Sequence, residues 1–572
     1  MSEQTTDTTA EKPHPALSVR GMIIGGIGSA FISASSLYIA LKLGALPWPI
    51  VFAALLSLFF LKLLKRTTLN EVNVTHTAMS AGAMVAGGLA FTIPAIWMLG
   101  LGDGIDLPML LLVSLGGVVL GLLATACIRR YFIDTSKLAY PIGVSAAETL
   151  LVTEDTSKRR TIALFSGMGI AAIYAFIRDN LGLLPSMLFS KVNIPGVSFG
   201  IYNSPMMLAI GFIVGPAACL IWFGGAVIGD LGVVVAGSAA GLWDSTFGEG
   251  IKKSLGMGVM LGAGIGILLV QMIPVVVKHF KQALARPANT AADKSADTAA
   301  RATESSSAIA AKPSDLRQRK RIHLSSAVIS AVIACVVSFA LGLPLLQSVL
   351  LVAGTWVAVF MSSQSVGVSG INPMEVFAIM VLLLIQLAFH ETGLATIFLL
   401  AAIVAVACGL AGDVMNDFKA GALIGTKPRD QWVAQAIGGV IGAVVASVLM
   451  LVLLQVYGAE SFGLDKTFLA TQASMVATMA SGIPNLPAFG IGFVVGLVLA
   501  CFRLPVMTLG LGIYLPFYFS LTALIGGLLK LAFDKVTKRR YEAEGTAVAS
   551  GLLGGESLIG VFGAIVLMFT AL

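Results

Sequence analysis

Apolar runs of about twenty residues follow one another along almost the whole chain, and few charges interrupt them. Only 11% of the 572 residues are charged, while 57% are hydrophobic. A soluble protein carries about 25% charged residues, so a water-soluble fold of this length could not cover its surface. About twenty apolar residues suffice for a helix to cross a bilayer. The sequence therefore predicts an all-α, polytopic integral membrane protein.

The apolar runs predict about 14 to 17 transmembrane helices. Segment 140–152 is too short to cross and begins with Tyr140-Pro141, which favours a half-helix or re-entrant element. Segments 228–243 and 467–481 are also short. The candidate spans are 21–43, 46–64, 73–99, 107–128, 161–181, 203–226, 228–243, 252–276, 324–341, 344–362, 374–391, 394–411, 432–456, 467–481, 485–501, 505–532 and 550–571.

Glycine is abundant inside these apolar runs. The chain has 63 glycines, well above the average share of about 7%. Small residues let helix backbones approach closely in lipid, and glycine tolerates the broken helices that surround transporter sites. We therefore expect dense helix packing with interrupted segments.

A polar, basic segment at 278–323 divides the chain. It holds ten Lys and Arg against four Asp and Glu, which nearly accounts for the net charge of +7. The positive-inside rule makes this segment a cytoplasmic loop, and the alternative, nucleic-acid binding, has no supporting motif. We expect a disordered cytoplasmic tail at 1–19, an N-terminal transmembrane half at 20–277, the basic cytoplasmic linker at 278–323 and a C-terminal transmembrane half at 324–572.

An internal echo indicates that the two halves are related by duplication. Pro205 and Pro216 frame the same pattern as Pro505 and Pro516, with Met two residues after the first proline and a Gly-Gly pair further on. A weaker echo joins 81–83 to 420–422, both Ala-Gly-Ala. Chance similarity between glycine-rich helices is the alternative. Internal repeats with a site near the midplane are typical of secondary transporters.

Ionisable residues inside apolar spans are costly and suggest function. Asn73, His76, Thr77 and Ser80 share one helical face. An imidazole titrates near neutral pH, so His76 is a candidate proton carrier, with Asn73 and Thr77 as substrate contacts. The alternative is a histidine satisfied by a neighbouring carbonyl.

The half-helix at 140–152 carries a second candidate group. Ser145, Glu148 and Thr149 share a face, and Glu148 is a candidate proton carrier, while Tyr140 is a candidate substrate contact. The alternative for Glu148 is a plain salt bridge with Lys158 or Arg159 at the cytoplasmic mouth.

Asp413, Asn416 and Asp417 form a third group on one face. Two carboxylates this close split their titration, so one holds a proton to higher pH. The pair suits a proton site, a cation site or a contact for a substrate amino group. A solvated helix end is the alternative, since Lys427 and Arg429 follow.

Further candidates are more isolated. Gln472 lies on a polar stripe in the short segment 467–481, and Asn372, Gln472 and Tyr514 are candidate substrate contacts. Glu556, alone in the last span, is a candidate proton carrier. Asp230 and Asp244 look like residues close to loops.

Several classes of protein lack their signature here. The sequence has no GxxxxGK[ST] motif for ATP and no HExxH or GxSxG motif. The five cysteines are odd in number and form no CxxC pair, which disfavours disulfides and zinc. We therefore expect neither an enzyme nor a metal or cofactor, and a passive channel stays as an alternative of another class.

Several stretches resemble the prokaryotic branch of the oligopeptide transporter (OPT) superfamily, which is related to the yellow-stripe-like transporters. The resemblance covers nearly the whole chain except 1–19 and 278–323, and 409–438 and the final block are its more specific parts. The stretches are NVTHTAMSAGAMVAGGLAFTIPA (73–95), KLAYPIGVSAAETL (137–150), NSPMMLAIGFIVGP (203–216), GVSGINP (367–373), GLAGDVMNDFKAGALIGTKPRDQWVAQAIG (409–438), LPVMTLGLGIYLP (504–516) and ASGLLGGESLIG (549–560).

The resemblance implies secondary active import, with proton-coupled symport of small oligopeptides by alternating access. Metal chelates, such as siderophore or nicotianamine complexes, are the substrates of the yellow-stripe-like branch and remain the alternative. The expected partners are this small-molecule substrate, protons and the lipid bilayer, without nucleic acid, and a homodimer is left open. The location expected is the inner membrane, with the N-terminus and the linker in the cytoplasm.

Overall fold

The computed structural model describes residues 15–43, 46, 50–64, 67–102, 104–136, 138–151, 158–189, 191–192, 194–267, 269–270, 313–389, 392–463, 466–480, 483–502, 504–538 and 540–571. These residues are almost wholly helical, which confirms the all-α class. The named strands, β1 (Met187–Leu188) and β2 (Ile201–Tyr202), pair antiparallel in one small hairpin.

In chain order, the helices of the first half precede and follow the β1–β2 hairpin. π-Helical stretches continue three of these helices. The helices are α1 (Val19–Leu43), α2 (Ile50–Leu63), α3 (Leu69–Ala90), α4 (Pro94–Met98), α5 (Leu107–Arg129) with η1 (Arg130–Thr135), α6 (Pro141–Leu151), α7 (Lys158–Ala175) with η2 (Phe176–Asn180), α8 (Pro205–Val214), α9 (Pro216–Ala226) with η3 (Val227–Ala236), α10 (Gly237–Ala239) and α11 (Ser245–Ile267).

The second half begins with helix α13. Its elements are α13 (Pro313–Ala340), α14 (Leu345–Ser369), α15 (Met374–Ala388), α16 (Leu394–Ile424), α17 (Pro428–Tyr457), η5 (Ala459–Ser461), α18 (Thr471–Ala480), α19 (Leu486–Cys501), α20 (Val506–Tyr514), α21 (Phe517–Thr537) and α22 (Glu542–Ala571).

Nine helical stretches of the described chain are long and apolar enough to cross a membrane, and five shorter apolar helices accompany them. The expected half-helix is α6, and the short segment 467–481 forms α18. Helix α13 begins at Pro313, inside the range expected for the linker. Residues 1–14 of the expected tail and 278–312 of the expected linker lie outside the described residues.

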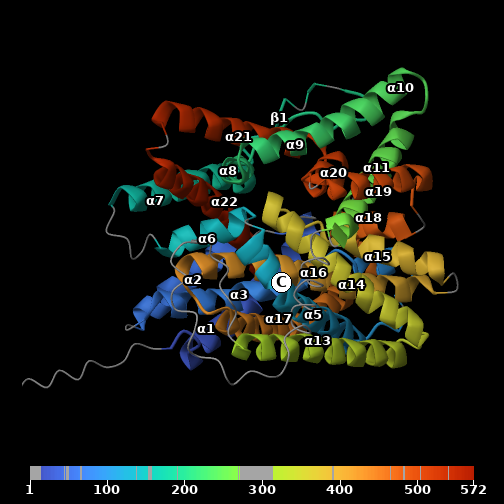
Figure 1. The fold of residues 1–572 in the computed structure, drawn as a ribbon, viewed down its shortest axis with the longest axis horizontal. Coiled ribbons are helices and arrows are strands. Elements are labelled where there is room, and N and C mark those ends of the chain that lie inside the picture. Colours follow the sequence, from blue (N-terminus) through green and yellow to red (C-terminus); the bar gives the residue numbers. More distant parts are fainter. Residues whose placement is uncertain are drawn as a thin grey trace, which may run out of the picture.

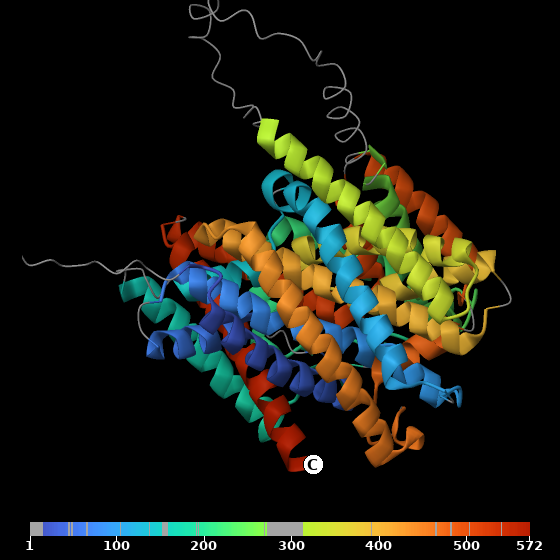
Figure 2. The ribbon, with the colours of Figure 1, turned by 90° about the horizontal axis from the view of Figure 1, so that it is seen from below.

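The helices form two bundles, and each bundle draws on both halves of the chain (Figure 1). The first bundle contains α1–α5 and α13–α17, with α3 packed against α1, α16 and α17. The second bundle contains α7–α11 and α19–α22, in which α11 packs against α19 and α7 against α22. The short helices α6 and α18 lie between them. Figure 2 shows α13 along the outside of the first bundle, where it contacts α5 and α14.

The predicted echo corresponds to a matched pair of broken helices. Helix α8 ends at Gly215, which has φ +90°, and α9 starts at Pro216, while α20 and α21 are separated by Leu515 and Pro516. The two pairs also pack on each other reciprocally, α8 against α21 and α20 against α9. This arrangement supports duplication. The Ala-Gly-Ala triplets at 81–83 and 420–422 have different surroundings. Gly82 packs on the backbone of Gly442, whereas Gly421 packs on the side chain of Gln431, and both partners belong to α17.

The starts of α6 and α18 repeat one backbone contact. The N–H of Tyr140 donates to Gly367 O at 2.8 Å, and the N–H of Ala470 donates to Leu41 O at 2.9 Å. Both donors have positive φ, 47° and 38°, which is uncommon for residues other than glycine. The acceptors lie near the C-terminal ends of α14 and α1, so each short helix is tied to the opposite half of the chain in the same way.

Helices α3 and α16 occupy equivalent places in the two halves and run antiparallel. A Cβ at Gly88 would lie 2.7 Å from Val406 Cα. Further along, Ser80 contacts Asp413 and His76 contacts Asp417, so residue numbers fall on α3 as they rise on α16. Equivalent helices that run in opposite directions define an inverted repeat, which is a transporter architecture.

The glycines allow backbone contact between α3 and α17. A Cβ at Gly438 would lie 1.9 Å from Ala78 O. We expect Gly438→Val to destabilise the protein by about 1–3 kcal/mol or more, because the helices must separate. Gly490→Val is the matched control, since no atom lies within 4 Å of its Cβ position. Thermal unfolding in detergent measures both variants, and equal stability would contradict this packing.

Candidate functional site

The polar face of α3 is held in place at its N-terminus. Thr68 caps the helix by accepting a hydrogen bond from Glu71 N at 3.1 Å. The buried Glu71 carboxylate pairs with Arg20 at 2.7 Å and accepts from Ser18 at 2.6 Å. These contacts fix α1 against the first turn of α3. The polar face predicted on α3 therefore begins at a turn that hydrogen bonds and an ion pair hold in place.

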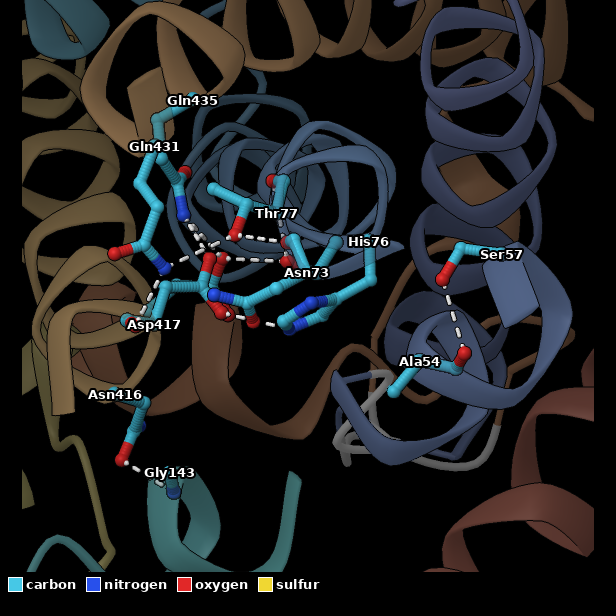
Figure 3. Close-up of polar contacts among 12 residues, drawn as sticks. Ala54, Ser57, Asn73, His76, Thr77, Gly143, Asn416, Asp417, Gln431 and Gln435 are labelled. Atoms are coloured by element: carbon cyan, nitrogen blue, oxygen red, sulfur yellow. Dashed lines mark hydrogen bonds and ion pairs between the residues drawn. The ribbon is translucent and has the colours of Figure 1, made fainter. Parts of the chain in front are cut away.

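His76 and Asp417 of α16 meet in the interior of the first bundle (Figure 3). His76 Nε2 lies 3.1 Å from Asp417 Oδ1, and both side chains are fully buried. Their contact has the distance of an ion pair but lacks hydrogen-bond alignment. Ser80 donates to Asp413 Oδ2 at 3.1 Å, one turn away on the same helices. The structure thus brings together residues that the sequence left in two separate groups.

Two glutamines of α17 complete this arrangement. Helix α16 ends at Gly425 with φ +91°, and Pro428 starts α17, so a tight turn returns the chain alongside α16. Gln435 Nε2 donates to Asp417 Oδ2 and lies 3.4 Å from Asp413 Oδ2. Gln431 donates to the backbone oxygen of Asp417 at 2.6 Å. We call His76, Ser80, Asp413, Asp417 and Gln435 the His76 cluster.

The His76 cluster has unused hydrogen-bonding capacity. Asp413 Oδ1 and His76 Nδ1 have no hydrogen-bond partner among the described residues. Two carboxylates that share one amide donor in a buried setting repel each other when both are charged, and a shared proton relieves this repulsion. The cluster therefore combines buried ionisable groups with open hydrogen-bonding positions, and the described residues contain no group of three side chains that could bind a metal ion.

Asn73 and Thr77, predicted as substrate contacts, use their donors within the protein. Asn73 donates to Thr426 Oγ1 at 2.8 Å, and Thr77 donates to Asn73 O at 2.8 Å. Thr426 in turn donates to Asn70 Oδ1 at 2.7 Å. These bonds tie α3 to the turn between α16 and α17. Asn73 Oδ1 alone has no partner among the described residues.

Helix α6 is attached directly beside the His76 cluster. The N–H of Gly143 donates to Asn416 Oδ1 at 3.1 Å, and Asn416 precedes Asp417. Tyr140 is fully buried, and its hydroxyl donates to Ser363 O at 3.0 Å. Glu148 lies elsewhere on α6, where Arg160 donates to its carboxylate. Among the described side chains its partner is Arg160, one residue after the Arg159 named from the sequence.

Three further predicted residues belong to elements other than those that form the His76 cluster. Asn372 accepts from Ser362 at 2.9 Å and donates to Cys408 O at 2.9 Å, which anchors the break between α14 and α15 on α16. Tyr514 is buried at the end of α20, and Gln472 is half-buried on α18.

Glu556 belongs to a separate site in the second bundle. Arg178 Nη2 donates to its carboxylate at 2.8 Å, and Ser204 Oγ and Met206 N donate at 2.9 and 2.7 Å. Both charged side chains are less than a tenth exposed. Glu556 therefore holds α22 to α7 and to the first turn of α8.

Sequence reasoning missed several interior polar residues. Asp230 looked close to a loop, yet it is 2% exposed and pairs with buried Lys252 at 2.7 Å. Gln435, Arg178 and Glu375 were not singled out. Gln435 follows Gln431 by four residues, and this i, i+4 spacing on an apolar helix was the available signal.

The fold and its buried ionisable groups define a multi-pass helical membrane protein with an inverted repeat, the architecture of secondary transporters. The family described as OPT oligopeptide transporter protein matches residues 16–567, so the chain belongs to this family. The resemblance found in the sequence is confirmed.

Three relatives illustrate the breadth of the similarity. A putative oligopeptide transporter of Haemophilus influenzae is 25% identical over 590 residues, which cover 92% of this chain and 91% of that protein. The probable metal-nicotianamine transporter YSL5 of Arabidopsis thaliana is 28% identical over 181 residues, 27% of this chain and 25% of that protein. The metal-nicotianamine transporter YSL2 of Arabidopsis thaliana is 30% identical over 203 residues, 30% and 31% of the two chains.

Proposed function

We propose that this member of the OPT family is a proton-coupled importer of small oligopeptides across the inner membrane. The buried contact between His76 and Asp417, with Asp413 and Gln435 beside it, carries the proposal. A proton carrier must be ionisable, shielded from water and linked to a part that moves. The His76 cluster is buried, and Asn416 links it to α6.

The proton would be held by Asp413 and Asp417 and exchanged with His76. Protonation removes the repulsion between the two carboxylates and weakens the pull of Asp417 on a charged His76. Because Asn416 and Asp417 are neighbours on α16, a shift of this helix alters the contact at Gly143. The proposed substrate contacts are Tyr140 at the start of α6, Asn372 before α15, Gln472 on α18 and Tyr514 at the end of α20.

Glu148 and Glu556 stay proposals as proton carriers. Each pairs with an arginine, Arg160 and Arg178, outside the His76 cluster. Replacing either glutamate by glutamine distinguishes a proton carrier from a structural anchor. Loss of a proton carrier abolishes proton coupling, whereas loss of an anchor lowers stability.

Uptake of labelled di- to pentapeptides into proteoliposomes tests the proposal. We expect accumulation above the external concentration when the outside is acidic and the membrane potential is negative inside, and equilibration when a protonophore is present. Accumulation that ignores both gradients would overturn proton coupling. Saturable accumulation also separates a symporter from a passive channel, which can only equilibrate its substrate.

Metal chelates are the second candidate substrates, because the relatives that match part of the chain include metal-nicotianamine transporters. The same uptake assay with nicotianamine and siderophore complexes distinguishes the two classes.

The positive-inside rule, applied to the basic linker, favours a cytoplasmic location of the N-terminus and the linker in this proposal. A homodimer is a further proposal, which mass measurement in detergent tests.

A further inference from the structure

Glu375 differs from every other buried acidic side chain that the structure describes. It is 8% exposed and lies at the start of α15. Its carboxylate interacts with its own backbone N–H, and no charged side chain of the described residues acts on it. The other buried acids all have partners: Glu71 with Arg20, Asp230 with Lys252, Asp413 with Ser80, Asp417 with His76, and Glu556 with Arg178.

Glu375 lies where the two bundles meet. It belongs to α15 of the first bundle and interacts electrostatically with the phenol of Tyr514, the last residue of α20 in the second bundle. It also interacts electrostatically with the thiol of Cys408 on α16. Tyr514 and Cys408 are thus two titratable groups near it among the described residues. Interfaces between packed units are preferred positions for ligand sites.

The position is close to the centre of the inverted repeat. Met374, the residue before Glu375, packs against Gly87 of α3 and Gly409 of α16. These glycines adjoin Gly88 and the antiparallel contact with Val406. Glu375 is therefore an interior carboxylate, displaced along α3 and α16 from the His76 cluster.

Helix breaks converge on the same place. The chain between α14 and α15 turns at Gly370, with φ +76°, and α20 ends where Leu515 and Pro516 separate it from α21. Irregular backbone inside a membrane protein is tolerated where it is buried in protein or borders a cavity. Transporters use such breaks to surround their substrate.

The equivalent position in the other half is apolar. Helix α2, the counterpart of α15, begins Ile50-Val51-Phe52, so its first turn has no ionisable side chain where α15 has Glu375. Val51 Cγ1 lies 2.6 Å from the Cβ position of Gly554 on α22. Close apolar packing is thus sufficient for this kind of interface, and helix packing alone does not require a carboxylate at 375.

We propose that Glu375 binds the primary ammonium group of the transported substrate. The inference rests on the proposed import of peptides and names the group recognised. Before binding, the carboxyl group is neutral and holds its proton. When the ammonium group docks, the carboxyl passes this proton inward, towards the His76 cluster, and forms an ion pair, so Glu375 and the bound group stay neutral together and the proton moves with the substrate. An isolated charge in the interior is avoided at each stage.

Modification by a hydrophobic carbodiimide, which reacts with protonated buried carboxyls, tests the site in the purified full-length protein. We expect mass spectrometry to find the adduct on Glu375 and not on Glu71, which is also buried but paired with Arg20. Tetra-alanine should slow the modification of Glu375 about tenfold, because its ammonium makes a charge-assisted bond. N-acetylated tetra-alanine, which has no ammonium group, should not slow the modification of Glu375.

Competition for uptake gives the second readout. In the parent protein, free tetra-alanine should compete about tenfold better than its acetylated form, and Glu375→Gln should remove the difference. Glu542→Gln, on the exposed start of α22, is the matched control and should preserve it. Modification that spares Glu375, or that both peptides slow equally, would overturn the inference. Absence of peptide accumulation contradicts the proposed function instead, and the labelling result still decides the chemistry of Glu375.

Discussion

Asp417→Asn is expected to abolish proton-driven accumulation while the protein continues to exchange substrate. A proton moving down 100 mV supplies about 2.3 kcal/mol, which sustains about a fifty-fold gradient of a neutral substrate. The asparagine keeps the shape of the side chain next to His76 and Gln435 but cannot carry the proton. Accumulation should therefore fall to equilibration, as measured with labelled peptide under an imposed potential.

Counterflow provides the control for folding of the Asp417→Asn variant. Labelled peptide outside should still exchange with unlabelled peptide inside, because this exchange needs no net proton movement. Asp534→Asn removes an acid that pairs with Lys530 at the end of α21 and should accumulate peptide like the parent. Normal accumulation by Asp417→Asn would refute the assignment of the proton to this residue.

Arg178→Gln is expected to destabilise the protein by about 3–5 kcal/mol, because it leaves the charge of Glu556 buried without its partner. Ser204 and Met206 N would still donate to the carboxylate, but they carry no compensating charge. The variant should unfold at clearly lower temperature in detergent and should be recovered in lower yield.

The double variant Arg178→Gln with Glu556→Gln is expected to regain most of this stability. Replacing both members of a buried ion pair removes the unpaired charge, and such exchanges are often close to neutral. The same protein tests Glu556 as a proton carrier, since an anchor can be neutralised in this way without loss of coupling. Failure of the second substitution to restore stability would show that the pair is not the source of the effect.

The class of fold could be predicted from the sequence because lipid leaves few alternatives. Long apolar runs must be helices, and the short run after Tyr140 could not cross, so α6 was expected. The proline and glycine echo also pointed to α8–α9 and α20–α21. These features depend on local composition, which a sequence displays directly.

The assembly of the candidate site could not be predicted in the same way. His76 and Asp417 are separated by most of the chain, and nothing in their local sequences states that α3 and α16 are antiparallel neighbours. Asp230 was misplaced because its partner, Lys252, comes from another helix. Glu148 and Glu556 looked alike in the sequence as acids in apolar surroundings, and only their arginine partners distinguish them from Asp413 and Asp417.

Helix α13 has a consequence for how the protein is made. It lies along the outside of the first bundle, contacts α5 and α14, and precedes the other helices of the second half. A duplicated segment that followed its parent directly, after an even number of crossings, would enter the membrane in the same orientation. One added crossing, such as α13, would reverse it, and the two copies would then form the inverted repeat.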